Sequence, residues 1–170
     1  MKNMKTQISG KSINIITSSG NSYDFKFISK IMPQKNDDVI IRETVFQSDS
    51  DSEKNRHGNG PFCSFNIDLG SISEGVYIFC LDNEIQYIGE SKDLNRQFND
   101  GFGRIEEINT TTRGRSTNCK LNHAILAEAK KGKFFNLFVF ETKEHKKVKK
   151  EILEGFFETY NRKPKYNGRS

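Results

Sequence analysis

The sequence predicts an α+β domain in which a small mixed β-sheet is flanked by helices. Residues 8–46 alternate apolar and polar side chains with period two, which is typical of strands. Two further short apolar runs flank a tight turn at Asp82-Asn83. Residues 117–131 and 145–160 instead space their apolar side chains three and four apart, which indicates amphipathic helices.

The first half of the chain is predicted to be β-rich. Strands are expected in the runs SINII, SYDFKFISKI and DDVIIRETVF, with turns at 19–21 and 33–38 between them. Residues 47–61 contain no strongly apolar side chain and are predicted to form an exposed loop or linker. These features divide the chain into a β-rich N-terminal arm, residues 1–70, and a second domain, residues 71–170.

The second domain is predicted to follow the order β-β-α-α-β-α. Its expected elements are strands 76–81 and 84–88, a short helix 91–98, a helix 117–131, a strand 134–140 and a helix 145–160. A Gly-flanked turn is expected at 100–103. Gly132 is expected to end the first long helix and Pro164 the second.

Charge and composition restrict the classes of function. The net charge is +5, from 27 Lys+Arg and 22 Asp+Glu, and the whole excess lies beyond residue 74. A basic surface favours polyanions such as nucleic acid.

No apolar run approaches the ~20 residues that span a bilayer, so a cytoplasmic protein without membrane contact is expected. The three cysteines stand far apart and form no CxxC, which argues against a disulfide framework or a Cys-rich zinc site.

Two tyrosines on the predicted hairpin draw attention, in Gly75-Val76-Tyr77 and Tyr87-Ile88-Gly89. In an ideal ladder closed by a two-residue turn, Tyr77 pairs with Ile88, and the two hydroxyls lie on opposite faces. A longer turn or a one-residue bulge would bring them to the same face. The pattern leaves both arrangements open.

At these residues the sequence resembles the GIY-YIG nuclease superfamily, with restriction-endonuclease-like members as the nearest type. The matching segments are GVY at 75–77, YIGESKDL at 87–94, GFG at 101–103, STNCK at 116–120 and EGFFETYNRKPKYN at 154–167. Either tripeptide alone is common, but the pair at this spacing together with the Pro-Lys-Tyr-Asn ending is specific. The resemblance covers about 90 residues.

The resemblance implies hydrolysis of a DNA phosphodiester bond with one divalent metal, Mg²⁺ or Mn²⁺. By match, Tyr77 would help to deprotonate the attacking water and Tyr87 would hydrogen-bond near the nucleophile and the phosphate. Glu154 would hold the metal, with Glu151 as the next choice, and Asn167 would support the site. A tyrosine is a poor base at its free pKa of ~10, so this mechanism needs the metal and nearby cations to depress it.

One position departs from the family pattern. The family carries a phosphate-binding arginine ten residues after the YIG tyrosine, where this chain has Gln97; the arginine stands one residue earlier, at Arg96. A shift of one residue turns a helical side chain by about 100°. Arg96 could bind the phosphate if the helix begins one residue differently, or Arg104 could do so. Otherwise the phosphate-binding charge is lost, because an amide does not replace a guanidinium on a phosphate.

Further basic residues are predicted to contact nucleic acid. Lys92, Arg104, Arg113 and Arg115 are placed to meet phosphates, and the two loop arginines could also reach base edges. His145 has no carboxylate at a convincing sequence spacing and is expected at the surface.

The function expected from these residues is a Mg²⁺-dependent, restriction-type DNA endonuclease acting on double-stranded DNA. Cutting both strands makes a homodimer on DNA plausible, and the N-terminal arm would supply target contacts or the dimer interface. The alternative is a catalytically silent GIY-YIG domain that binds nucleic acid or protein without cleaving, which Gln97 favours.

Overall fold

The computed structural model describes residues 3–47 and 53–168. Their contacts form two compact units, each assembled from separate stretches of the chain. Unit 1 contains residues 3–30, 69–94 and 135–168, and unit 2 contains residues 31–68 and 95–134. The chain passes from unit 2 back to unit 1 between Asp68 and Leu69, close to the boundary expected at residue 70, and residues on both sides of this point contribute to both units.

Unit 1 is built on a six-stranded sheet in the order β1-β2-β3-β8-β6-β7. The strands are β1 (Lys5–Ile8), β2 (Ser12–Ile16), β3 (Ser22–Lys30), β6 (Gly75–Leu81), β7 (Glu84–Ser91) and β8 (Asn136–Glu141). Every pairing in this sheet is antiparallel. The α+β class is confirmed, but the expected mixed sheet is wrong: each chain segment that leaves the sheet re-enters it in the antiparallel sense, and no crossover produces a parallel pair.

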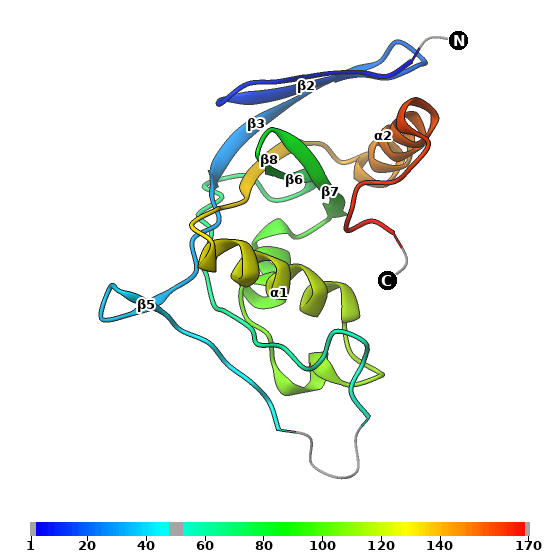
Figure 1. The fold of residues 1–170 in the computed structure, drawn as a ribbon. Helices are drawn as coiled ribbons and strands as arrows, with labels where there is room; N and C mark the ends of the chain where they lie inside the picture. The colour runs from blue at the N-terminus through cyan, green and yellow to red at the C-terminus, as the bar shows by residue number, and fades with distance from the viewer. Residues whose placement is uncertain (1–2, 48–52, 169–170) are drawn as a thin grey trace. The chain divides into compact units, whose positions relative to one another are not determined.

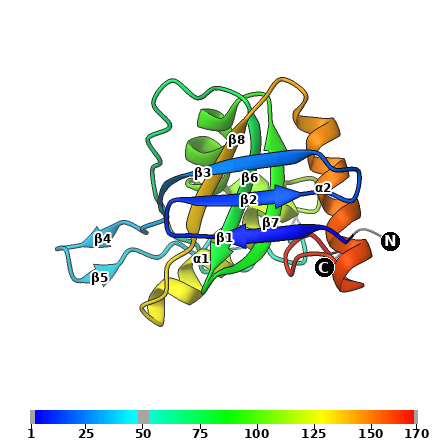
Figure 2. The same ribbon diagram turned by 90° about the horizontal axis from the view of Figure 1, so that it is seen from above.

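The sheet is strongly curled. Figures 1 and 2 show β1–β3 crossing over β6–β8, with α2 (His145–Tyr160) lying along the inner side of the curve. One apolar cluster joins the sheet to this helix, including Val76, Ile78 and Ile88 of the hairpin and Val148, Ile152 and Phe156 of α2. The helix has the predicted bounds, but Asn161 ends it rather than Pro164: its φ of 52° is left-handed and its N–H donates to the Phe157 carbonyl at 2.8 Å.

The β6–β7 hairpin resolves the alternative left open by the pattern. Asp82 and Asn83 both have positive φ (50° and 60°), as the two-residue turn requires. The register then slips by one residue, so Phe79 pairs with Tyr87 and Tyr77 with Gly89. The bulge leaves Gln86 without a partner across the ladder and turns both tyrosines to one face of the sheet.

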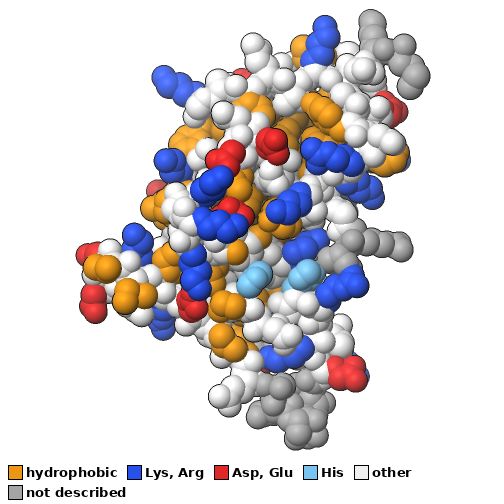
Figure 3. Space-filling view, viewed as in Figure 1, with side chains coloured by type: hydrophobic (Ala, Val, Ile, Leu, Met, Phe, Trp, Pro, Cys, Tyr) orange, Lys and Arg blue, Asp and Glu red, His pale blue; other side chains and the backbone are white. Residues whose placement is uncertain are grey.

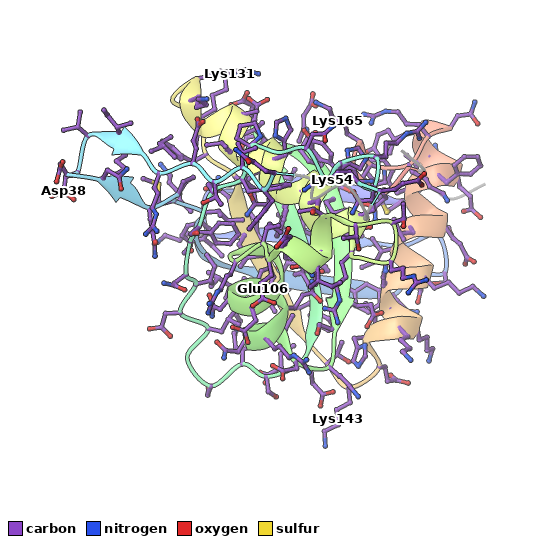
Figure 4. All side chains as sticks on the ribbon, turned by 90° about the horizontal axis from the view of Figure 1, so that it is seen from below. Asp38, Lys54, Glu106, Lys131, Lys143 and Lys165 are labelled. Atoms are coloured by element: carbon purple, nitrogen blue, oxygen red, sulfur yellow. The ribbon has the colours of Figure 1, made fainter. Side chains whose placement is uncertain are left out.

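Unit 2 contains a small hairpin and the remaining helices. Its elements are β4 (Lys35–Asn36), β5 (Ile40–Ile41), the π-helix η1 (Arg96–Phe102), the 3-10 helix η2 (Glu107–Thr110) and α1 (Ser116–Lys130). Asp38 lies at the tip of the β4–β5 hairpin (Figure 4). The long strand predicted in DDVIIRETVF is reduced to Ile40–Ile41, and η1 begins later than the predicted helix 91–98 and takes in most of the predicted turn.

Fully buried Asn122 of α1 holds the core of unit 2 together. Its Nδ2 donates to the carbonyls of Cys63 (2.8 Å) and Phe102 (2.7 Å), and its Oδ1 accepts from the Cys63 N–H at 2.9 Å. Within the predicted loop 47–61, residues 48–52 lie outside the described part. The following segment is bound rather than free, because the Asn55 amide donates to the carbonyls of Asn109 and Thr111.

None of the helices in the described ranges has the length and apolar character that crossing a membrane requires.

Candidate functional site

Tyr77 and Tyr87 form a buried hydrogen-bonded pair on one face of the β6–β7 hairpin. Their ring centroids lie 6.1 Å apart, and a hydrogen bond joins their two hydroxyls. Gly89 permits this arrangement, because a Cβ at that position would overlap the Tyr77 ring. The glycine of the YIG segment is thus explained by close packing.

The surroundings of the pair oppose ionisation. Burial raises the pKa of Tyr77 well above 10.0, and the neighbouring Tyr87 and Glu90 add to the rise. Burial also raises the pKa of Tyr87. A general base needs the opposite shift, so the chain's own residues do not prepare either tyrosine to take a proton.

Asn167 supports this hairpin from the C-terminal segment. Its Oδ1 accepts from the Ile88 N–H and its Nδ2 donates to the Ile88 carbonyl, both at 2.8 Å. The Tyr166 N–H also donates to the Gln86 carbonyl at 2.9 Å, so the segment covers the outer edge of β7 at the bulge. The amide predicted to support the site is occupied by backbone contacts to the YIG strand.

Glu154 lies away from the tyrosines. Alternation along β6 and β7 places Tyr77, Phe79 and Tyr87 on one face, whereas α2 packs against Val76, Ile78 and Ile88 on the other. The Glu154 side chain is 61% exposed and lies 3.8 Å from Lys150 Nζ. It lines a hollow of about 590 Å³ on α2, and neither tyrosine is among the lining residues.

The surroundings of Glu154 do not fit a divalent cation that also serves the tyrosines. The hollow has a net positive charge that opposes a cation, because its three glutamates are outnumbered by four lysines: Lys146, Lys149, Lys150 and Lys163. Within residues 3–47 and 53–168, no group of three or more His, Cys, Asp or Glu side chains is arranged to hold a metal. The expected convergence of Tyr77, Tyr87 and Glu154 in one cavity is therefore absent from the described residues.

Glu151, the alternative metal ligand, is committed to a structural role. Its carboxylate accepts from Thr17 (2.6 Å), Asn21 (2.9 Å), Tyr23 (2.8 Å) and Ser19, which ties α2 to the β2–β3 turn. Its pKa falls to about 2: partial burial opposes the shift, but hydrogen bonds from Ser19, Thr17, Tyr23 and Asn21 outweigh it.

His145 is buried rather than at the surface, contrary to the prediction. Its Nδ1 lies 2.5 Å from Glu90 Oε2 and its Nε2 lies 3.8 Å from Glu74 Oε2, with the side chain only 11% exposed. The cluster joins the start of α2 to the strands of the hairpin. The sequence could not predict this cluster, because Glu90 and Glu74 lie 55 and 71 positions before His145 in the chain. The folding of the sheet brings them to the start of α2.

The predicted arginines all belong to unit 2. Arg96 opens η1 and is exposed, whereas Gln97 is half-buried and its amide approaches Asn118 Oδ1 at 3.5 Å. The two adjacent side chains thus face different surroundings, as the helical rotation requires, and Arg96 does not occupy the position of Gln97. Arg104, Arg113 and Arg115 are exposed, and in unit 1 Lys92 is also exposed.

Four lysines gather on the outer surface of α2 and just beyond its end. We use the name lysine stripe for Lys146, Lys149, Lys150 and Lys163. Of these, Lys150 approaches Glu154, whereas Lys146, Lys149 and Lys163 have no acidic partner among the residues described. Figure 3 shows blue basic side chains beside orange apolar ones over the part of the surface where Figure 1 places α2.

Comparisons with models of known protein families, with curated proteins and with solved structures found no match to this chain.

Proposed function

We propose that this chain is a GIY-YIG-type domain that binds nucleic acid, with the phosphate backbone meeting the lysine stripe of α2. The observation that carries the proposal is the set of three lysines on one surface without acidic partners in the described structure. Lysines already paired gain little from a phosphate, whereas unpaired ones release counterions from the nucleic acid on binding. The resemblance to DNA-acting proteins supports the same class of ligand.

The test compares two triple variants by fluorescence anisotropy on a labelled duplex at several salt concentrations. In K146Q/K149Q/K163Q the slope of log K against log salt should flatten by about 2–3, since each phosphate contact contributes about 0.9. The control, K11Q/K26Q/K30Q, removes three exposed lysines of the same unit from the region of β2 and β3. Equal slopes for both variants, or no binding by the unmodified protein, would refute the proposal.

The second candidate is the metal-dependent, restriction-type DNA endonuclease. The β6–β7 bulge favours it, because it brings the hydroxyls of the GVY and YIG tyrosines together at the centre of the resemblance. Cleavage of both strands by such a site predicts a homodimer on DNA. Sedimentation of the protein with and without a duplex measures that state.

The cleavage test incubates plasmid DNA with purified protein in Mg²⁺ and in Mn²⁺, alongside Tyr77→Phe and Glu154→Gln. Cutting that Tyr77→Phe removes and Glu154→Gln retains supports a nuclease whose metal ligand is another residue. Cutting lost in both supports the role of Glu154 that the resemblance implies. Binding without cutting by the unmodified protein supports the silent domain, and Gln97→Arg then tests whether the missing guanidinium accounts for the loss.

A further inference from the structure

The hollow on α2 combines charge with an apolar floor. Leu153 and Phe157 line it together with the lysine stripe, and the Phe157 side chain is 50% exposed. Its volume of about 590 Å³ lies within the range of small-molecule sites. Binding of a phosphate backbone requires only the lysines. The half-exposed Phe157 ring beside them is therefore a further contact site for an apolar or aromatic group.

The sequence spacing places these side chains in one row. Residues 146, 149, 150, 153 and 157 follow the three- and four-residue steps that keep side chains on one face of a helix. Lys163, just beyond the helix, closes the row at the Phe157 end. The apolar pair Leu153 and Phe157 is therefore flanked by ammonium groups on both sides along α2.

The hollow keeps an excess of one positive charge, because its four lysines outnumber Glu90, Glu154 and Glu158. Glu90 lies against His145, Glu154 approaches Lys150, and Glu158 Oε2 accepts from the Ser18 hydroxyl at 3.3 Å. The unpartnered cations are Lys146, Lys149 and Lys163. The hollow therefore suits a ligand that has an aromatic face between two anionic groups.

We propose that this hollow binds an unpaired nucleotide of a nucleic-acid strand, with its base stacked on Phe157 and its flanking phosphates on the unpartnered lysines. This inference rests on the proposed function and specifies its substrate class. Every base has a π-face that an aromatic side chain can stack on, and such stacking is largely independent of sequence. In a duplex that face is covered by the neighbouring base pairs, so single-stranded or gapped nucleic acid is preferred.

The experiment measures binding of a fluorescent oligo-dT strand and of a duplex of equal length to the full chain. Phe157→Leu keeps an apolar side chain but removes the ring. Phe27→Leu is the control, because Phe27 is another partly exposed phenylalanine, at 37%, and lies on β3 outside the hollow. A second readout places 2-aminopurine in the strand, whose fluorescence is quenched by stacking; the chain has no Trp to interfere.

The inference predicts that Phe157→Leu weakens single-strand binding at least about fivefold, the low end of one stacked base. It also predicts loss of the quenching, with duplex affinity unchanged. Unchanged single-strand affinity in Phe157→Leu would overturn the inference but leave the proposed function standing if the lysine variants still flatten the salt dependence. Failure of the unmodified protein to bind either form would remove both. Equal displacement by poly-glutamate of matched charge would instead favour an acidic peptide and contradict the nucleotide.

Discussion

Both faces of the β6–β7 hairpin are buried, but they carry different side chains, and α2 packs against the face of Val76, Ile78 and Ile88. One face carries Tyr77, Phe79 and Tyr87, which are buried and neutral, and the hydroxyls of the two tyrosines bond to each other. The other face packs against α2, whose outer surface carries an open hollow lined by lysines. The two tyrosines of the resemblance to a nuclease thus lie on one side of the sheet, and the charge suited to a phosphate lies on the other. The difference suggests that packing fixes much of the hairpin motif, whereas α2 supplies the binding surface.

The largest expected effect on the free energy of unfolding concerns the face of the hairpin that carries Tyr77 and Tyr87. Gly89→Ala should destabilise the protein by about 2–3 kcal/mol, because the new Cβ overlaps the Tyr77 ring and a full core cannot take an added methyl group. Urea unfolding measures the change. Gly10→Ala is the control, since its Cβ would meet nothing within 4 Å. An equal, small effect at both positions would show that the tyrosine face is not tightly packed.

The contact between α2 and the β2–β3 turn gives the next largest effect. The Glu151 pKa is about 2 in the folded chain against an ordinary 4.5, so its contribution is present above pH 4.5 and lost as pH falls toward 2. Glu151→Gln should therefore destabilise the protein by roughly 1–3 kcal/mol at pH 7 and by progressively less in acid. Thermal unfolding between pH 2 and 7 measures this. Parallel curves for the two proteins would contradict the assignment.

The C-terminal segment that covers the outer edge of β7 should contribute less to the free energy of unfolding. Asn167→Ala removes both hydrogen bonds to Ile88 and should cost about 1–2 kcal/mol. Amide hydrogen exchange at Ile88 should rise together with the loss of stability. If exchange there stays slow, the C-terminal segment does not protect the edge of β7.

The smallest effect on the free energy of unfolding is expected for the lysine stripe. Lys149→Gln should leave the unfolding free energy within about 0.5 kcal/mol of the unmodified protein and flatten the salt slope of duplex binding by about 0.9. The two quantities are measured on the same sample. A change in stability without a change in slope would mean that Lys149 acts on the fold.

Much of the fold could be predicted because many of its elements are determined by local sequence patterns. The helix at 145–160, the turn at Asp82-Asn83 and the strand at 76–81 each depend on neighbouring residues, and the structure places them close to their predicted bounds. The shared face of the tyrosines could not be fixed, because one bulged residue reverses it and Gln86 carries no signal of a bulge. The position of Glu154 also depends on which face α2 covers. That face is decided by packing against β1–β3, which no local pattern reveals.

We expect nucleic acid to meet the surface of unit 1 that carries α2, and not the face that carries the two tyrosines. Backbone NMR shifts of the full chain, recorded during titration with an oligo-dT strand, distinguish the two faces residue by residue. We predict that the largest changes fall on residues 146–163 and that the amides of Tyr77 and Tyr87 move little. Changes concentrated at the two tyrosines, with α2 unaffected, would contradict the assignment of binding to the lysine stripe.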